Sequence, residues 1–111
     1  MNWFLCMRRD AEPREDWTVS RDTHLAWMQT KHASGQVVMS GPVVGGGLAM
    51  YLIREADRDA AVNVAQGDPF VAAGHCNFEL LEWRVHQIMG VGAFGEAALG
   101  DTIVSERPGQ K

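Results

Sequence analysis

Residues 66–83 read QGDPFVAAGHCNFELLEW, and the change of periodicity inside this stretch decides the fold. Upstream, the alanine-rich run that starts after Asp57 has the spacing of a helix, and Gly67 ends it. Downstream, residues 76–86 alternate apolar and polar side chains with a period of two, as a strand does. The stretch therefore predicts a helix that ends, a short turn, and a last strand.

The Asp68-Pro69 pair in the middle of this stretch has two interpretations. In the structural one, Asp68 accepts a backbone N–H bond as an N-cap, and Pro69 takes the first position of a new helical turn, where its missing donor does no harm. In the chemical one, the carboxylate also brings a full negative charge that could fix the tautomer of a histidine. The residue type alone does not choose between them.

The rest of the chain supplies one more helix and three more strands. Residues 2–8 form a predicted strand with large apolar side chains on both faces. A helix capped by Ser20 or Asp22 runs to about Ser34, with Leu25, Met28 and His32 on one face and His24 at its edge. Two β-rich runs, QVVMSGP and GLAMYLI, are joined through the glycine-dense VVGGG as a hairpin.

The resulting order is strand, helix, strand, strand, helix, strand. This is the split βαβ, ferredoxin-like α+β arrangement, in which both helices cover one face of a four-stranded antiparallel sheet. The other sheet face would expose an apolar patch, so we expect a second subunit to cover it, in a homodimer or a higher homo-oligomer. Residues 1–86 make up this domain, and residues 87–111 are expected to be an irregular, oligomer-contacting C-terminal extension with a frayed end.

Composition and charge limit the classes of molecule that the protein is expected to bind. The chain has 111 residues and a net charge of -4, so it is one domain without the basic footprint that nucleic acid or an anionic membrane requires. Cys6 and Cys76 are too few for a disulfide framework, and no set of Cys and His residues has metal-ligand spacing. No apolar run reaches the length of a membrane span. We expect a cytoplasmic protein with a small-molecule substrate, without cofactor or metal.

Several polar residues could carry chemistry, and each has a structural alternative. Arg8, at the end of the first strand, could clamp a substrate carboxylate or could be a solvated strand end. His24 could be an acid or base if a carboxylate orients it, or a satisfied core histidine. Ser40 could donate a hydrogen bond to a developing oxyanion, and His75 could point into a cavity or into solvent. Four apolar side chains could line that cavity or be plain core: Phe4, Trp27, Met28 and Phe70.

Four short motifs, THLAWM, KHASGQ, SGP and DPFVAAG, occur in this order along the chain. Together they resemble the YCII-related family of the dimeric α+β barrel superfamily over residues 1 to about 86. The resemblance implies a ferredoxin-like subunit that dimerises through its sheet, with a pocket between sheet and helices. The proposed active-site pair of that family falls on His24 and Asp68. The short VVGGG loop and the tail after His86 depart from the family pattern.

A His–Asp pair without nucleotide motif or activated nucleophile indicates proton transfer rather than redox or hydrolytic chemistry. We therefore expect a cofactor-free acid/base enzyme of the lyase or isomerase type. Its catalytic residues would be His24, Asp68 and Ser40, and its substrate a small organic acid or a cyclic biosynthetic intermediate. The alternative is a non-catalytic ligand-binding or accessory protein that uses the same pocket.

Overall fold

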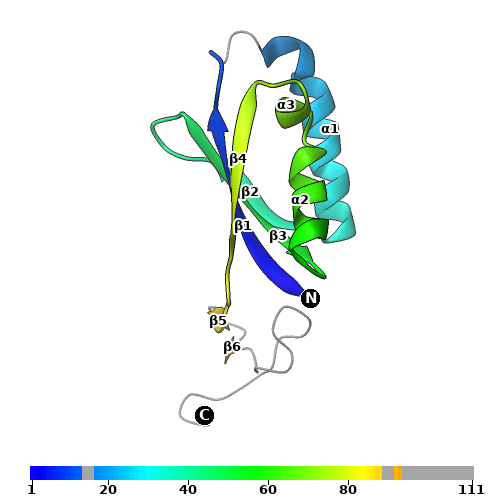
Figure 1. Ribbon diagram of the computed structural model, residues 1–111, viewed down its shortest axis with the longest axis vertical. Helices are drawn as coiled ribbons and strands as arrows, with labels where there is room; N and C mark the ends of the chain where they lie inside the picture. The colour runs from blue at the N-terminus through cyan, green and yellow to red at the C-terminus, as the bar shows by residue number, and fades with distance from the viewer. Residues whose placement is uncertain (14–16, 89–91, 94–111) are drawn as a thin grey trace.

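The computed structural model describes residues 1–13, 17–88 and 92–93 (Figure 1). Within them the predicted order of strands and helices is confirmed. The elements are β1 (Asn2–Asp10), α1 (Thr18–Ser34), β2 (Val37–Pro42), β3 (Leu48–Glu55), α2 (Arg58–Gln66), α3 (Pro69–Ala72), β4 (Cys76–Glu82), β5 (Gln87–Ile88) and β6 (Gly92–Ala93).

The four long strands form one sheet in the order β2-β3-β1-β4, with every neighbouring pair antiparallel. All three helices lie on the same face of this sheet (Figure 1). The fold is therefore the ferredoxin-like α+β arrangement that the sequence predicts. The chain end expected to extend from residue 87 lies mostly outside the described residues, apart from the short antiparallel pair of β5 and β6.

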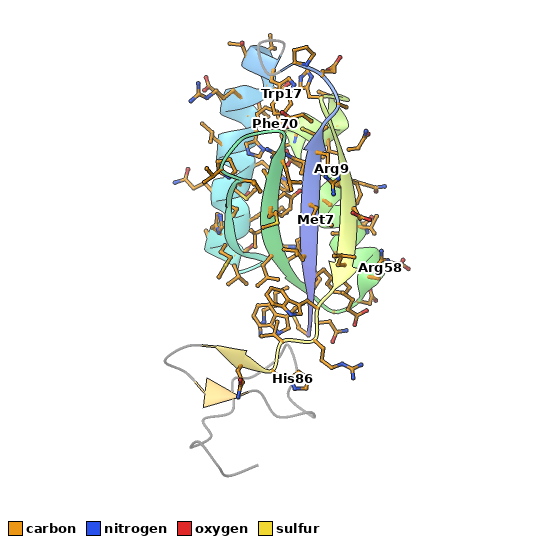
Figure 2. All side chains as sticks on the ribbon, turned by 90° about the vertical axis from the view of Figure 1, so that its left-hand side faces the viewer. Met7, Arg9, Trp17, Arg58, Phe70 and His86 are labelled. Carbon is orange, nitrogen blue, oxygen red and sulfur yellow. The ribbon has the colours of Figure 1, made fainter. Side chains whose placement is uncertain are left out.

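The alternation in β1 separates the two faces of the sheet. Phe4 and Cys6 are fully buried beneath the helices, where they join Ile53 of β3 and Leu80 of β4 in the main core. The opposite face carries four large apolar side chains that are exposed in the single chain, Met39 (63%), Met50 (38%), Leu81 (47%) and Trp83 (51%). Figure 2 shows the side chains of the described residues on the ribbon. One end of this second face is covered, where Trp3 and Leu52 are buried with Val85, and the rest of it is open.

Helix α1 begins earlier than predicted, at Thr18 rather than after Ser20 or Asp22. Trp17 occupies the N-cap position and makes no side-chain capping bond there. Its ring is buried against Phe70, with ring centroids 4.9 Å apart, so packing rather than capping fixes the start of the helix. The predicted end is confirmed, because Gly35 adopts the left-handed conformation at φ 79° that glycine favours.

The predicted buried face of α1 is shifted. His24 is buried rather than at the edge, whereas Leu25 is 54% exposed and His32 is also exposed. The helix is anchored by Trp17, and His24 lies seven residues further on, two turns along the same side. Met28 follows one turn later and packs against the core. The anchor at Trp17 therefore turns His24 toward the sheet.

The helices α2 and α3 are each capped by an aspartate, and for Asp68 this is the predicted capping role. Asp57 caps α2 by accepting a bond of 2.9 Å from the backbone N–H of Ala60. Asp68 caps α3 by accepting a bond of 3.0 Å from the N–H of Phe70, with Pro69 in the first turn. A Cβ atom at Gly67 would lie 3.4 Å from the indole nitrogen of Trp27. The end of α2 therefore approaches α1 closely at this point.

Strand β4 ends at Glu82, whereas the period-two pattern predicts strand up to His86. The reason is the register against β1, because the N–H of Trp83 bonds to the carbonyl of Trp3 at 2.8 Å, one residue after β1 begins. Beyond that point β1 offers almost no backbone to pair with.

Among the described residues, no helix is long and apolar enough to cross a membrane.

Candidate active site

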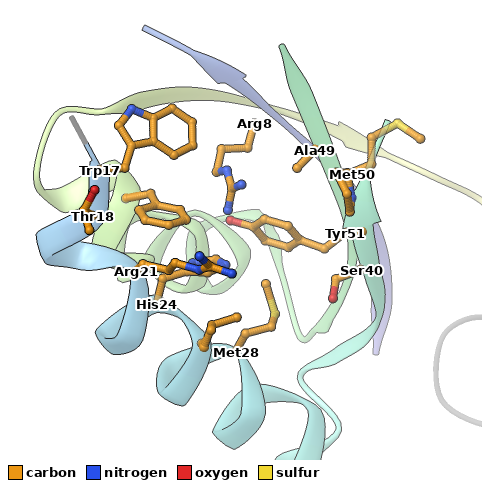
Figure 3. Close-up of a pocket in the computed structure, with 14 residues that line it drawn as sticks. Arg8, Trp17, Thr18, Arg21, His24, Met28, Ser40, Ala49, Met50 and Tyr51 are labelled. Carbon is orange, nitrogen blue, oxygen red and sulfur yellow. The ribbon is translucent and has the colours of Figure 1, made fainter. Parts of the chain in front are cut away.

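A cavity of about 610 Å³ lies between α1 and the sheet, next to α3 (Figure 3). The N-terminal half of α1 supplies one wall, the ends of β1, β2 and β3 supply the other, and α3 closes one side. The lining residues are Arg8, Trp17, Thr18, Arg21, His24, Leu25, Met28, Ser40, Gly41, Pro42, Ala49, Met50, Tyr51 and Phe70.

Asp68 lies just behind this cavity and is fully buried. Its Oδ1 accepts hydrogen bonds from His24 Nδ1 at 2.7 Å and from the backbone N–H of Phe70 at 3.0 Å. Its Oδ2 accepts bonds from Arg8 Nη1 at 3.0 Å and from the Tyr51 hydroxyl at 3.4 Å. One carboxylate therefore ties together β1, β3, α1 and α3.

The charge of Asp68 follows from these partners. Burial by itself would raise the pKa of the Asp68 carboxyl. The hydrogen bond and charge of His24 act in the opposite direction, together with the Arg8 guanidinium and the N–H of Phe70, and the pKa of Asp68 is lowered overall. The group is therefore a carboxylate at neutral pH, and its capping and charge-pairing roles coexist.

His24 is held in place on two sides. Its ring stacks on Phe70, with centroids 4.2 Å apart and an interplanar angle of 14°. Because an ionised carboxylate only accepts hydrogen bonds, Nδ1 carries the proton that Asp68 Oδ1 accepts. In the neutral ring this leaves a lone pair on Nε2, and no group of the described residues bonds to that nitrogen. The histidine thus has one nitrogen fixed by Asp68 and one available at the cavity.

Arg8 is not a solvated strand end, because it is only 5% exposed. The strand alternation that buries Phe4 and Cys6 also directs Arg8 toward the helices. Its guanidinium carbon lies 5.0 Å from the ring centroid of Phe70, and Nη1 bonds to Asp68. The guanidinium is therefore fixed at the cavity wall by a buried ion pair.

Tyr51 in the cavity lining and Cys6 in the core both stay protonated. Burial, reinforced by the neighbouring Cys6 and Asp68, strongly raises the pKa of Tyr51, so its hydroxyl remains a donor at neutral pH. Burial also raises the pKa of the Cys6 thiol to about 11, despite the hydrogen bond to Tyr51 that lowers it. Cys6 is thus a thiol in the core and not a thiolate nucleophile.

The other predicted site residues divide into two groups. Met28, Phe70 and Ser40 line the cavity, and the Ser40 hydroxyl also lies 2.8 Å from His32 Nε2. Two predicted lining residues belong to the core instead: Phe4 is fully buried, and Trp27 packs against the core cluster. At these two positions the side chains pack into the main core between the helices and the sheet, so they do not line the cavity.

His75 lies in neither the cavity nor open solvent. Its Nδ1 is 2.6 Å from Glu12 Oε1, its Nε2 is 3.2 Å from Ser20 Oγ, and its ring stacks on Trp17. It joins the end of β1, the first turn of α1 and the turn before β4. His75 therefore connects elements rather than facing the cavity.

Among the lining residues that sequence reasoning missed are Tyr51, Trp17 and Arg21. Strand alternation gives Tyr51 the face of Ile53, and Arg21 precedes His24 by nearly one helical turn, so both signals were present in the spacing. Trp17 precedes the predicted start of the helix.

Within the described residues, no group of three or more His, Cys, Asp or Glu side chains is arranged to hold a metal ion.

The fold and the cavity define a ferredoxin-like α+β protein with a site between sheet and helices. A profile of the YCII-related domain matches residues 2–84, and the chain belongs to this family. No protein with a curated description matches the sequence.

One solved structure with a similar fold is a 5-chloro-2-hydroxyhydroquinone dehydrochlorinase from Burkholderia phenoliruptrix, in complex with 2,5-dihydroxybenzoquinone. The similarity has a TM-score of 0.64 and covers 75% of this chain and 94% of the dehydrochlorinase, at 19% sequence identity. At this identity the likeness bears on the fold.

Proposed function

We propose that this protein is an acid/base enzyme of the lyase or isomerase type that acts on a small cyclic organic acid or hydroxylated ring. The observation that carries the proposal is the placement of His24, with Nδ1 bonded to a buried carboxylate and Nε2 available at a cavity. A general base needs an available lone pair and a partner that stabilises its cation, and Asp68 supplies the second.

In the proposed reaction, His24 Nε2 takes a proton from carbon or oxygen of the substrate. The bonding pair left behind forms a new π bond. In an elimination, the leaving group departs with the electron pair of its own bond. In an isomerisation, an adjacent π bond opens, and its electron pair takes the proton back from His24 at a different atom. Asp68 stabilises the imidazolium formed in the first step, and the Ser40 hydroxyl could donate to negative charge that develops on a substrate oxygen.

Two findings support the kind of substrate. The cavity of about 610 Å³ has the size of a small-molecule site, and the aromatic side chains Trp17, Tyr51 and Phe70 offer flat surfaces to a ring. A structural relative with the same fold removes chloride from a hydroxylated ring and was captured with a dihydroxyquinone. We propose a substrate of comparable size for this protein, with no cofactor.

Incubation in deuterium oxide tests the proposal directly. The wild-type protein should release chloride from 5-chloro-2-hydroxyhydroquinone, or should introduce carbon-bound deuterium into members of a panel of small cyclic acids and hydroxyquinones, faster than buffer does. His24→Gln should lose that activity because the amide retains a donor for Asp68 but offers no base. His75→Gln is the matched control and should keep it.

Activity that survives in His24→Gln would exclude the general-base role. If the wild-type protein binds panel members but turns over none, the alternative of a non-catalytic ligand-binding or accessory protein takes its place.

We also propose that the open sheet face is covered by a second copy of the chain, in a cytoplasmic homodimer built on residues 1–86. The four exposed side chains Met39, Met50, Leu81 and Trp83 support this, because monomers rarely leave a large apolar patch in water. Sedimentation should give a dimer for the wild type and a monomer for Leu81→Glu. A wild-type monomer at micromolar concentration would exclude this arrangement.

A further inference from the structure

The charges around the cavity are unbalanced in favour of cations. Among the described residues the lining includes two arginines, Arg8 and Arg21, and no aspartate or glutamate, although the whole chain has a net charge of -4. The Asp68 carboxylate behind the cavity has both oxygens occupied by donors from the protein. An entering ligand therefore meets positive charge that is not fully compensated.

The two arginines differ in how they are held. Arg8 is buried and fixed by its bond to Asp68, and its Nε has no hydrogen-bond partner among the described residues. Arg21 is exposed on α1, three residues before His24, and no carboxylate of the described residues pairs with it. Figure 3 shows both side chains reaching into the space between the sheet and α1. The Arg8 guanidinium is thus held in one position, whereas the Arg21 side chain can change its conformation.

The remaining walls suit a flat, largely apolar body. Phe70 and Trp17 present aromatic rings, and Met28 and Leu25 present flexible apolar chains from the helix. Buried guanidinium groups bind carboxylates and other delocalised oxyanions well because their planar donors match two oxygens at once. The cavity therefore combines a ring-sized apolar part with donors suited to a delocalised negative charge.

We infer that the ligand of this cavity is a planar organic anion, and that Arg21 is the residue that selects for its charge. The anionic end is held by Arg21 from the helix side and by Arg8 from the strand side, while the ring lies against Phe70 and Met28. This deepens the proposed function by naming the charge state of the ligand, and it rests on the cavity being the substrate site, not on catalysis.

Calorimetric binding of benzoate and benzamide provides the test, because the two probes have nearly the same shape and differ in charge. The wild-type protein should bind benzoate at least about tenfold more tightly than benzamide, as expected for charge-assisted hydrogen bonds. In Arg21→Gln the benzoate affinity should fall by about tenfold while the benzamide affinity is unchanged. Arg21 is exposed, so its replacement should leave the circular dichroism spectrum and the urea midpoint unchanged.

Arg9→Gln is the matched control. Arg9 is the neighbour of Arg8 on β1, is exposed, and points to the opposite face of the sheet, where it lies 4.0 Å from Glu79. The Arg9→Gln variant should keep the full preference for benzoate, because the removed charge lies outside the cavity and its effect there is screened by solvent.

The inference is overturned if the wild type binds both probes equally or binds neither, or if Arg21→Gln retains the preference for benzoate. Failure of the proposed function looks different. In that case benzoate binding depends on Arg21 as described, but no deuterium incorporation or chloride release is catalysed.

Discussion

Two histidines of this protein make almost the same contact with a carboxylate, in very different surroundings. His24 Nδ1 lies 2.7 Å from Asp68 Oδ1, and His75 Nδ1 lies 2.6 Å from Glu12 Oε1. The Asp68 side chain is fully buried, whereas that of Glu12 is 46% exposed. A short histidine–carboxylate distance is therefore common to a candidate catalytic pair and to a surface connection.

The second ring nitrogen separates the two cases. His75 Nε2 lies within hydrogen-bond distance of Ser20, so both of its nitrogens are engaged by the protein. His24 Nε2 has no such partner among the described residues and belongs to a cavity-lining side chain. What marks a candidate base is thus a buried, fully bonded carboxylate on one side of the ring and an available nitrogen on the other.

Replacement of each carboxylate by its amide should give the largest difference in stability between the two pairs. Asp68→Asn keeps a capping oxygen but leaves the buried Arg8 guanidinium without its anion, so the free energy of unfolding should fall by about 3 kcal/mol or more. Glu12→Gln should cost less than about 1 kcal/mol, because its carboxylate is half in water. Urea denaturation of both variants measures the difference. Equal losses would mean that burial does not distinguish the pairs.

Acid should weaken the buried pair in a defined direction. Asp68 has a pKa below its ordinary value of about 3.9, so its stabilising contribution is complete above about pH 4 and is lost as the pH falls through the lower folded-state pKa. The stability difference between wild type and Asp68→Asn should therefore be constant above pH 5 and shrink below pH 4. Unfolding curves recorded across this range give the difference, and a gap that stays constant down to the acid limit would contradict the charged state assigned to Asp68.

The hydroxyl of Tyr51 offers a finer test of the buried network. Tyr51→Phe keeps the ring that packs in the core and removes one of four donors to Asp68, so the free energy of unfolding should fall by about 1 kcal/mol. Thermal and urea unfolding measure this change. A variant as stable as the wild type would show that the 3.4 Å contact contributes nothing.

Loss of the His75 side chain should have the smallest functional effect. His75→Asn removes two partly exposed hydrogen bonds and should cost less than about 1 kcal/mol, since water replaces the lost partners. Benzoate affinity should equal that of the wild type, because His75 does not line the cavity. A clear loss of benzoate affinity would show that His75 acts on the cavity, and the functional distinction between the two histidines would be wrong.

The sequence predicts this fold well because the decisive signals are local. Gly35, Asp57 and Asp68 each act within a few residues of chain, and each ends or caps the helix that its position predicts. The end of β4 was predicted four residues too late, because it depends on where the distant strand β1 begins.

The candidate site was only partly predictable for the same reason. The resemblance to the YCII-related family points to His24 and Asp68, but the ion pair between Arg8 and Asp68 joins residues 60 positions apart. It depends on how β1, α1 and α3 pack together, which no local pattern encodes. Likewise, the pattern of α1 alone predicts a face of Leu25, Met28 and His32 with His24 at its edge. Only the packing of Trp17 turns His24 inward.

The most direct test of the central claim is ¹⁵N NMR of the histidine rings, recorded before and after addition of 2,5-dihydroxybenzoquinone. In the free protein, the neutral His24 ring should carry its proton on Nδ1, the nitrogen that bonds to Asp68. The ligand should shift the His24 Nε2 resonance and leave both His75 nitrogens unchanged. A proton on His24 Nε2, or a ligand that perturbs His75 and not His24, would contradict the assignment of His24 as the base of this site.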